Sequence, residues 1–422
     1  MKWGVYLVIL LLSSVAVSAY FDASPVKIKD DYFYEFDQKV IEDREITNDE
    51  GSCVYIKGSE WVALRGNYLH DCQPLNDKVL PPEKMGYVLY VEDVDQLVIE
   101  RNVFESSKYG IYLKNVNQVT FRMNNISAIE EGPAITIEGS TKVKIDGSSI
   151  REVKDGVLFL QTSDSSVERN KIIVAETAVD VIGTTEEDKY ARVSNIVVSD
   201  NSIMYSGEGI RFEGVNASEI IRNSITGDKA TSDGINLFFG VDNIEIADNT
   251  ISKAGDCGIM IKQSPENFIS ANSLSKNNRG ICLDGKDYAE GYYLLGNTGN
   301  KIHRNIFIGN KDSVVVLGRG NDEVEVFYNS FDTSEEEVTK ADLAWKDNSF
   351  VELPKTDEQN TTEPKIEVKP VVEEEPEQAV AEVIKQEPPE SPILTYALLT
   401  LLFVIIVIAV VIAVIKKAPK KR

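Results

Sequence analysis

Histidine, cysteine and methionine are scarce in this chain of 422 residues, which holds two, four and five of them respectively. Basic residues are also in deficit, because 44 Lys and Arg face 68 Asp and Glu and give a formal net charge of −24. This deficit excludes nucleic acid and anionic lipid surfaces as partners, since both are bound through clustered Lys and Arg. An acidic exterior instead suits a protein displayed at a cell surface.

Long apolar runs are missing from the middle of the chain and occur only near its two ends. Residues 1–19 are typical of a cleaved signal peptide, with a retained N-terminal anchor as the alternative. Residues 393–415 carry no charge and are long enough to cross a bilayer as a helix. Because the tail 416–422 is strongly basic, we expect it in the cytoplasm and everything before the helix outside. The sequence therefore predicts a single-pass type I protein of the plasma membrane.

Two short motifs recur through the rest of the chain. The first is Asn-x-Ile or a close variant, with a spacing of about 23 residues. The second is Gly-Ile followed by alternating apolar residues. A period of this length indicates stacked structural repeats. The first motif begins at Asn67, Asn102, Asn125, Asn170, Asn201, Asn223, Asn249, Asn272, Asn305 and Asn329, and the second at Gly110, Gly209, Gly234, Gly258 and Gly280.

The alternation of apolar residues within each repeat predicts short strands, because side chains in a strand point to opposite faces in turn. One repeat has room for roughly three strands and their turns. We expect each strand to pair in parallel with its counterpart one coil later, about 4.8 Å away. The recurring Asn is expected at a turn, where it tolerates unusual backbone angles and bonds to the backbone or to the next Asn.

These two motifs resemble the repeats of pectate-lyase-like right-handed parallel β-helix proteins, and of the NosD type in particular. The resemblance covers residues 51–332 and implies an all-β solenoid of about eleven coils. The NosD type also raises copper as a ligand, which is bound by His, Cys and Met. The chain has only His70 and His303, at opposite ends of the repeats. We therefore expect neither a metal site nor a cofactor.

The regions around the repeats complete the predicted organisation. Proline and acidic residues dominate the segment before the membrane helix, and it holds too little apolar surface to fold, so we expect an extended stalk. Leu343 and Trp345 are the apolar residues of the expected C-terminal cap. The boundaries are an N-terminal cap at 20–50, the β-helix at 51–334, the C-terminal cap at 335–353 and a disordered stalk at 354–392.

The four cysteines form two pairs in the sequence. Cys53 and Cys72 open and close one coil, so a disulfide between them is plausible outside the cell. Cys257 and Cys282 lie on neighbouring coils but out of register, which places them too far apart for a disulfide. We expect those two to be free thiols.

Three sequons are present, and their expected accessibility differs. Asn125 is expected to be inaccessible in the Asn column, whereas Asn216 on a turn and Asn360 in the stalk are candidate glycosylation sites.

A pair of carboxylates forms the candidate catalytic set. Asp233 and Asp256 both precede a Gly-Ile motif on consecutive coils and resemble the paired aspartates of polygalacturonases. Two such carboxylates could act as acid and base around a glycosidic bond. Cys257 stands where that family has a second Asp, and Arg279 lies near the expected His. The other interpretation is ordinary turn chemistry, because Asp-Gly and Gly-Asp are common in turns.

Two insertions interrupt the repeat after the Gly-Ile strands and are expected to frame a shallow groove. Binding residues often lie on such loops, and aromatic rings beside polar groups suit sugars. Neutral insertions are the alternative. The expected groove floor is Arg211, Glu213, Asn236, Phe238, Lys262 and Asp284, and the second loop adds Tyr288, Tyr292 and Tyr293.

Two functions fit these observations. The first is a cell-surface β-helix that binds envelope or extracellular polysaccharide. The second is a membrane-tethered polysaccharide lyase or glycoside hydrolase. The first is favoured because the second requires a complete catalytic set.

Overall fold

The computed structural model of the chain describes residues 33–34, 38–75, 81–183, 192–228, 232–285, 296–333 and 343–350. They belong to one unit that ends at Lys355. No helix among them is long and apolar enough to span a membrane. The expected signal peptide, stalk, membrane helix and basic tail lie outside the described residues.

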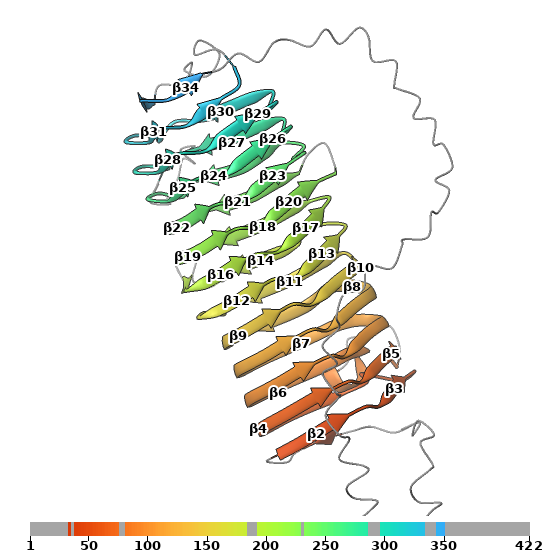
Figure 1. Cartoon of the computed structure of the whole chain (residues 1–422). Coiled ribbons are helices and arrows are strands. Elements are labelled where there is room, and N and C mark those ends of the chain that lie inside the picture. Colours follow the sequence, from red (N-terminus) through yellow and green to blue (C-terminus); the bar gives the residue numbers. More distant parts are fainter. Residues whose placement is uncertain are drawn as a thin grey trace, which may run out of the picture. The chain divides into compact units, whose positions relative to one another are not determined.

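The described residues form an all-β solenoid of about eleven turns, as the repeats predict. Each coil contributes up to three strands, and every strand pairs in parallel with its counterpart on the next coil. Figure 1 shows the strands stacked coil upon coil in the order of the sequence. We name the three faces after their motifs: the Gly-Ile face, the second face that follows it, and the Asn face that begins after each Asn.

The three faces are built from the following strands. The Gly-Ile face holds β1 (Phe33–Tyr34), the first part of β4 (Tyr55–Arg65), β6 (Tyr87–Glu100) and β7 (Val103–Arg122), β8 (Asn125–Glu138), β11 (Asp155–Leu160), β14 (Val179–Ile182), β18 (Glu208–Glu213), β21 (Asp233–Phe238), β24 (Cys257–Lys262), β27 (Arg279–Asp284) and β30 (Asp312–Val316). The second face holds β2 (Gln38–Glu42), later parts of β4, β6 and β7, β9 (Thr141–Asp146), β12 (Ser165–Glu168), β15 (Val193–Ser194), β16 (Ile196–Ser199), β19 (Val215–Ile221), β22 (Asp242–Ala247), β25 (Phe268–Ser270), β28 (Lys301–His303), β31 (Glu325–Phe327) and β33 (Ala344–Lys346). The Asn face holds β3 (Glu45–Asn48), β5 (Tyr68–Cys72), the starts of β7 and β8, β10 (Ser149–Val153), β13 (Lys171–Val174), β17 (Ser202–Tyr205), β20 (Ser224–Gly227), β23 (Thr250–Ser252), β26 (Ser273–Ser275), β29 (Ile306–Ile308), β32 (Ser330–Phe331) and β34 (Ser349–Phe350). One short 3-10 helix, η1 (Pro82–Lys84), lies between β5 and β6.

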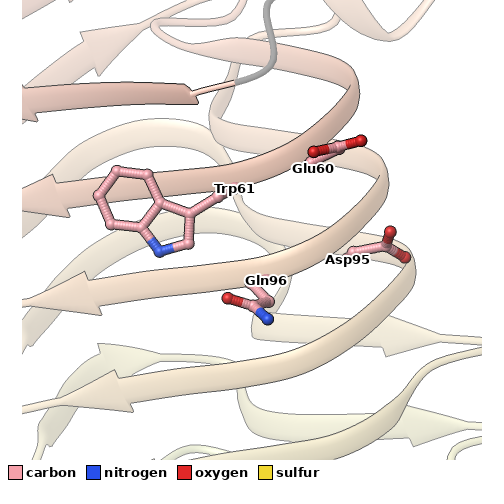
Figure 2. Close-up of a pocket in the computed structure, with 4 residues that line it drawn as sticks. All are labelled: Glu60, Trp61, Asp95 and Gln96. Carbon is pink, nitrogen blue, oxygen red and sulfur yellow. The ribbon is translucent and has the colours of Figure 1, made fainter.

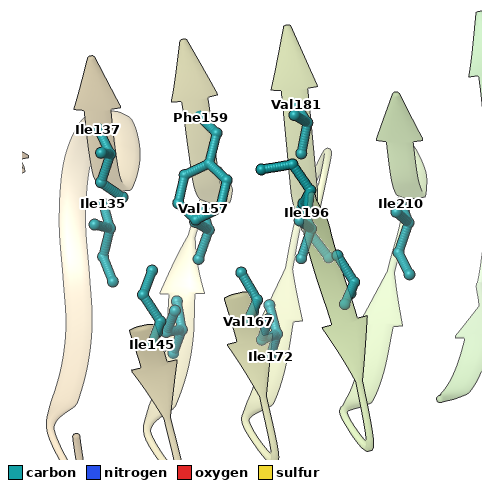
Figure 3. Packing of buried hydrophobic residues seen from close by; sticks show 14 of the residues in the cluster. Ile135, Ile137, Ile145, Val157, Phe159, Val167, Ile172, Val181, Ile196 and Ile210 are labelled. Atoms are coloured by element: carbon teal, nitrogen blue, oxygen red, sulfur yellow. The ribbon is translucent and has the colours of Figure 1, made fainter. Parts of the chain in front are cut away.

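Inward side chains of successive coils stack into columns that form the core. On the Gly-Ile face, Ile137, Phe159, Val181 and Phe212 occupy matching positions on consecutive coils and are fully buried. Figure 3 shows part of this packing between the faces. Full burial of each such side chain contributes about 1.5–3 kcal/mol, so the core extends with every coil added.

The Gly of each Gly-Ile motif is required by the close approach of the coils. A Cβ on Gly234 would lie 2.4 Å from the carbonyl oxygen of Gly258 and 2.5 Å from Cγ2 of Ile251. The same collision with the next coil's backbone occurs at Gly209 and Gly280. Because no side chain fits there, only Gly allows the neighbouring coils to approach this closely.

The recurring Asn forms a continuous buried ladder. Asn249 is typical, since its Nδ2 donates to Oδ1 of Asn272 at 3.0 Å and to the carbonyl of Ile220 at 2.7 Å. Its own Oδ1 accepts from the backbone N–H of Asn223 at 2.9 Å. The ladder runs through Asn67, Asn102, Asn124, Ser148, Asn170, Asn201, Asn223, Asn249, Asn272, Asn305, Asn329 and Asn348.

Two expectations about this ladder are wrong in detail. The third member is Asn124, which is 2% exposed, whereas Asn125 begins β8 and is half-buried. The unusual backbone angle belongs to the residue before the Asn, as at Asp248 with φ of 56° and Met123 with φ of 55°. The Asn side chain holds that strained turn by bonding the backbone on either side, which explains why no Gly is needed there.

The cysteines form two disulfides. Cys53 is bonded to Cys72, the pair that the sequence singled out. The prediction that Cys257 and Cys282 are free is wrong, because they are bonded to each other with their Cα atoms 6.0 Å apart. They are indeed three residues out of register, which in straight strands would be about 10 Å along the strand direction. The disulfide joins a residue that precedes the Gly of its motif to one that follows it, so side chains from the two sides of this Gly come together.

The last coil that the structure describes has short strands. Leu343 and Trp345 are partly buried and pack against the core, and the short strands β33 and β34 continue the parallel pairing. Whether residues 335–353 act as a cap stays a prediction.

Candidate functional site

The exterior of the Gly-Ile face gathers charged groups over the coils of β14, β18, β21, β24 and β27. Outward positions here are in register, as in the series Asp180, Arg211 and Asn236 on consecutive coils. Side chains before and after the Gly also come together, as Glu208 and Arg211 do at 3.8 Å. We call this group the central cluster; it consists of Asp180, Glu208, Arg211, Glu213, Asp233, Asn236, Phe238, Asp256, Lys262 and Arg279.

Arg211 is the centre of an ion-pair network within the cluster. Its guanidinium lies 3.3 Å from Oδ2 of Asp180 and 3.8 Å from Oε2 of Glu208, and it also donates to Glu213. Burial raises the pKa of Asp180 to about 6, although Arg211 opposes this shift. Sequence reasoning did not select Asp180 or Glu208, yet both are outward neighbours of the selected Arg211. The register of the repeats was sufficient to find Asp180, but it does not bring Glu208, three residues before Arg211 on the same strand, to that guanidinium.

Asp233 and Asp256 lie side by side, so the structure brings the predicted carboxylates together. Oxygen atoms of the two side chains lie within 4.8 Å of each other. Asp233 accepts a hydrogen bond from the backbone N–H of Cys257 at 2.9 Å, and Asp256 accepts one from Arg279 at 2.7 Å. Burial, together with the negative charges of Asp256 and Glu208, raises the pKa of Asp233 to about 7. Asp233 therefore holds a proton in about half of the molecules at neutral pH, while Asp256 is paired with a cation.

Two acceptor atoms of the cluster have no hydrogen-bond partner in the part of the chain that the structure describes: Oδ1 of Asn236 and Oδ1 of Asp180. Asn236 is 8% exposed, and its Nδ2 donates to Oε1 of Glu208 at 2.7 Å. A buried acceptor left without a donor costs about 1–3 kcal/mol. A polar ligand that donates hydrogen bonds here would remove that cost.

Phe238 and Lys262 lie where the groove floor was expected, but the ring of Phe238 is already engaged. The guanidinium of Arg211 lies 5.3 Å from the ring centroid and the ammonium of Lys262 lies 4.9 Å from it. These cations come from the coils before and after β21, so cation–π contacts fix their positions. Asp284 is the register neighbour of Lys262 on β27. Phe238 thus orients the cations instead of offering a free ring face.

The loops expected to frame the groove lie mostly outside the described residues. The two insertions are residues 183–192 and 284–299, and the parts outside the described residues are 184–191 and 286–295, which include Tyr288, Tyr292 and Tyr293. Asn216 is half-buried in β19, and Asn360 also lies outside the described residues. Use of these positions for binding or glycosylation stays a prediction.

Copper does not fit the residues present in the described ranges. Asp233, Asp256 and Cys257 are the one group of three or more potential His, Cys, Asp or Glu ligands that converges there, and Cys257 is consumed by its disulfide. His70 bonds two carboxylates, at 2.7 Å from Asp71 and 3.2 Å from Glu45. His303 stacks on Phe327. The described residues therefore offer no group of three imidazole or free thiolate ligands for a copper ion.

Sequence reasoning also missed an aromatic group on the Gly-Ile face, on the coils before the central cluster. We call it the tyrosine cluster. Its signal was present in the sequence, because tyrosines recur at one repeat spacing on the exterior positions of two neighbouring strands, β6 and β7. The cluster consists of Tyr55, Tyr87, Tyr90, Tyr109 and Tyr112.

A separate surface hollow lies near the curves of β4 and β6. Trp61 and Gln96 are register partners, and Glu60 and Asp95 lie where the two strands curve (Figure 2). The hollow belongs to later parts of the same strands that carry Tyr55 and Tyr90, but it faces away from the Gly-Ile exterior.

Solved structures share the fold at low sequence identity. The surface adhesin PfbA of Streptococcus pneumoniae is 12% identical, with a TM-score of 0.52 over 74% of this chain and 81% of that one. The periplasmic alginate epimerase AlgG is 11% identical, with a TM-score of 0.51 over 78% of this chain and 79% of that one. No curated protein matches the chain in sequence.

Family models match most of the solenoid. A right-handed β-helix region matches residues 30–172. The model described as periplasmic copper-binding protein (NosD) matches residues 128–344, about half of the chain. The right-handed β-helix expected from the repeats is thereby confirmed, and the chain belongs to the NosD family.

Proposed function

We propose that this protein is a membrane-anchored, extracytoplasmic β-helix that binds polysaccharide on the central cluster. The observation that carries the proposal is the buried Oδ1 of Asn236, which lacks a donor and lies next to the partly exposed side chains of Glu208 and Arg211. Sugar hydroxyls are donors of the required kind. Arg211 and Arg279 are ion-paired and lie on coils before and after that of Asn236. Their guanidinium groups can donate hydrogen bonds to sugar oxygens.

The extent of the cluster favours a polymer over a small ligand. From β14 to β27 it covers four coil steps, or about 19 Å at 4.8 Å per coil. Its groups are held rigidly by strands and ion pairs, which lowers the entropic cost of binding. An extended sugar chain can contact several coils at once, whereas a single ion or small metabolite contacts one.

The proposed location rests on the sequence and on the cysteines. Residues 1–19 and 393–415 have the composition of a signal peptide and a membrane helix. All four cysteines form disulfides, which persist in oxidising compartments outside the cytosol. A type I orientation would place the β-helix outside the cell.

The test is a binding screen of the full-length chain against immobilised neutral and acidic polysaccharides. Asn236→Ala removes the unpartnered acceptor and its bond to Glu208, and should weaken binding about fivefold to tenfold, the value of a single hydrogen bond. Asn117→Ala is the matched control, because Asn117 bonds Thr141 on the second face. Equal affinities for wild type and Asn236→Ala, or binding to none of the polymers, would contradict the proposal.

A second candidate function, cleavage of a polysaccharide, is favoured by one observation. Asp233 has a raised pKa of about 7 and lies beside the ion-paired Asp256. A protonated carboxyl next to an ionised one is the arrangement of acid and base in glycosidic bond cleavage. Release of new reducing ends or unsaturated sugars that is abolished in Asp233→Asn and Asp256→Asn would establish this activity. Binding without product release would exclude it.

A further inference from the structure

The tyrosine cluster lies on the same exterior as the central cluster and forms a tight stack of rings. Tyr90 stacks between Tyr55 and Tyr112, with ring centroids 5.3 and 5.4 Å apart. Tyr87 packs against the edge of this stack, 5.4 Å from Tyr90, 5.6 Å from Tyr112 and 5.3 Å from Tyr109. The rings immobilise one another, so the group forms a preformed aromatic surface.

Aromatic residues at these positions are not needed for the core. Tyr112 and Tyr90 are in register with Thr136 and Leu158 on the following coils, in an outward column. Tyr87, Tyr109 and Tyr112 remain partly exposed. An outward position in a solenoid can be filled by any polar side chain. Here, however, three neighbouring coils carry five tyrosines.

The hydroxyl groups at the border of the cluster are fixed by carboxylates. Tyr112 donates its hydroxyl to Glu138, and burial with this bond raises the pKa of Tyr112. Glu131 bonds Tyr109 and also forms an ion pair with Lys108 at 2.6 Å. The result is a partly exposed aromatic surface bordered by polar groups, an arrangement that suits the apolar faces and hydroxyls of sugar rings.

Register connects the two clusters along the helix axis. The outward column runs from Tyr112 through Thr136 and Leu158 to Asp180, a distance of three coil steps, or about 14 Å. Thr136 is buried, and Leu158 is half-buried. The intervening strip of this column is therefore uncharged, and the exterior column is continuous from one cluster to the other.

We propose that the tyrosine cluster is a second sugar-binding region on one continuous track, and that the ligand is a linear, uncharged polysaccharide lying parallel to the helix axis. This inference rests on the proposed function. The central cluster supplies hydrogen bonds and the tyrosine cluster supplies stacking. A chain long enough to span both gains two contacts in one binding event, which raises its affinity above that of either region alone.

The charge of the track determines the class of polymer. The central cluster contains five carboxyl groups against Arg211, Lys262 and Arg279, and its unpartnered atoms are acceptors. A uronate carboxylate placed beside Asp180 or Glu213 would meet like charge and an acceptor with nothing to donate. Hydroxyl groups of an uncharged sugar satisfy these acceptors without repulsion.

The test compares long and short forms of neutral polymers, namely β-glucan, xylan and mannan, with the acidic polymers polygalacturonate and alginate. The double variant Tyr109→Ala/Tyr112→Ala of the full-length chain should bind a long neutral polymer about tenfold more weakly, because aromatic contacts of this kind contribute about 0.5–1.5 kcal/mol each. Its affinity for short oligosaccharides that fit the central cluster alone should stay unchanged. Tyr328→Ala is the control, because Tyr328 is 54% exposed and lies outside the track.

The outcomes separate this inference from the proposed function. Binding of a neutral polymer that is reduced by Asn236→Ala but not by the tyrosine variant would overturn the inference and leave the function intact. Binding of acidic polymers alone would also overturn it. Failure of every polymer to bind would contradict both the inference and the proposed function.

Variants of packed tyrosines can lose their fold, so a second measurement uses the wild-type chain. Bound neutral polymer should protect Tyr109 and Tyr112 from nitration, as read by mass spectrometry, while Tyr328 is nitrated equally with and without polymer. Nitration of Tyr109 and Tyr112 that is unaffected by saturating polymer would contradict the inference. The conservative pair Tyr109→Phe/Tyr112→Phe keeps the rings and should retain most of the affinity.

Discussion

Single residues of the Asn ladder show both what the repeats could predict and what they could not. The motif predicted turn asparagines that bond one another, and the hydrogen bonds of Asn249 are of that kind. It misplaced one member by a residue, because the sequence has two adjacent asparagines, Asn124 and Asn125, and the motif fits the second. Only the geometry of the coil distinguishes the buried one. The residue before each Asn has a positive φ, but it cannot be recognised from the sequence because residues of many types occupy that position.

Asn249→Ala is expected to destabilise the protein by about 3 kcal/mol. The variant leaves the backbone N–H of Asn223 and the carbonyl of Ile220 without their buried partners, and each such loss costs about 1–3 kcal/mol. Chemical denaturation would measure the change in unfolding free energy. Asn117→Ala removes an exposed amide and should change it by less than about 0.5 kcal/mol. Similar effects of the two variants would contradict the structural role of the ladder.

Asp233→Asn is expected to stabilise the protein at pH 8 and to have little effect near pH 4. The native pKa of about 7 exceeds the ordinary value of 3.8, so the folded state binds the proton more tightly than the unfolded state. The wild type therefore loses stability as the pH rises from about 4 to 7, and the variant does not. Denaturation at several pH values measures the difference. A gain in stability that does not depend on pH would show that the pKa of the Asp233 carboxyl is not raised in this way.

At the scale of elements, the Gly-Ile motif marks a close approach of neighbouring coils as well as a strand. The alternation of apolar residues was enough to predict the strand, because it has a period of two. It did not predict that side chains before and after the Gly come together, as Glu208 and Arg211 do, and that omission led to the error over Cys257 and Cys282. If this convergence had been known, the disulfide and the contact of Glu208 with Asn236 could have been predicted together.

Gly234→Ala is expected to cost at least about 3 kcal/mol, the upper range for overpacking, because its Cβ would meet the backbone of the next coil at 2.4 Å. Gly240→Ala is the comparison, since its Cβ would have open space and only the positive φ of 68° opposes it. That strain costs about 1–2 kcal/mol. In thermal unfolding, the melting temperature of Gly234→Ala should lie well below that of Gly240→Ala. The reverse order would contradict the close approach of the coils.

The disulfide between Cys257 and Cys282 should contribute about 3 kcal/mol, because it closes a loop with a sequence separation of 25. The double variant Cys257→Ser/Cys282→Ser should therefore unfold at a lower temperature. Thiol titration of the denatured wild type should find no free cysteine, since all four are paired. Detection of two free thiols would show that this pair is unbonded in solution.

At the scale of the whole molecule, the repeats predicted the fold class and the number of coils, since one motif per coil can be counted in the sequence. The candidate site was predicted in part. Register placed Arg211, Asn236 and Lys262 on one exterior, but burial and hydrogen-bond satisfaction depend on three-dimensional packing, so the unpartnered oxygen of Asn236 had no sequence signal. The tyrosine cluster had such a signal in the spacing of its residues.

The most direct measurement is a crystal structure of the protein with a bound neutral oligosaccharide long enough to cover several coils. We expect electron density for the sugar along the exterior of the Gly-Ile face. One sugar hydroxyl should donate to Oδ1 of Asn236, and sugar rings should lie against Tyr109 and Tyr112. A sugar chain bound in the hollow at Trp61, or on the second or Asn face, with the central cluster left free would contradict it.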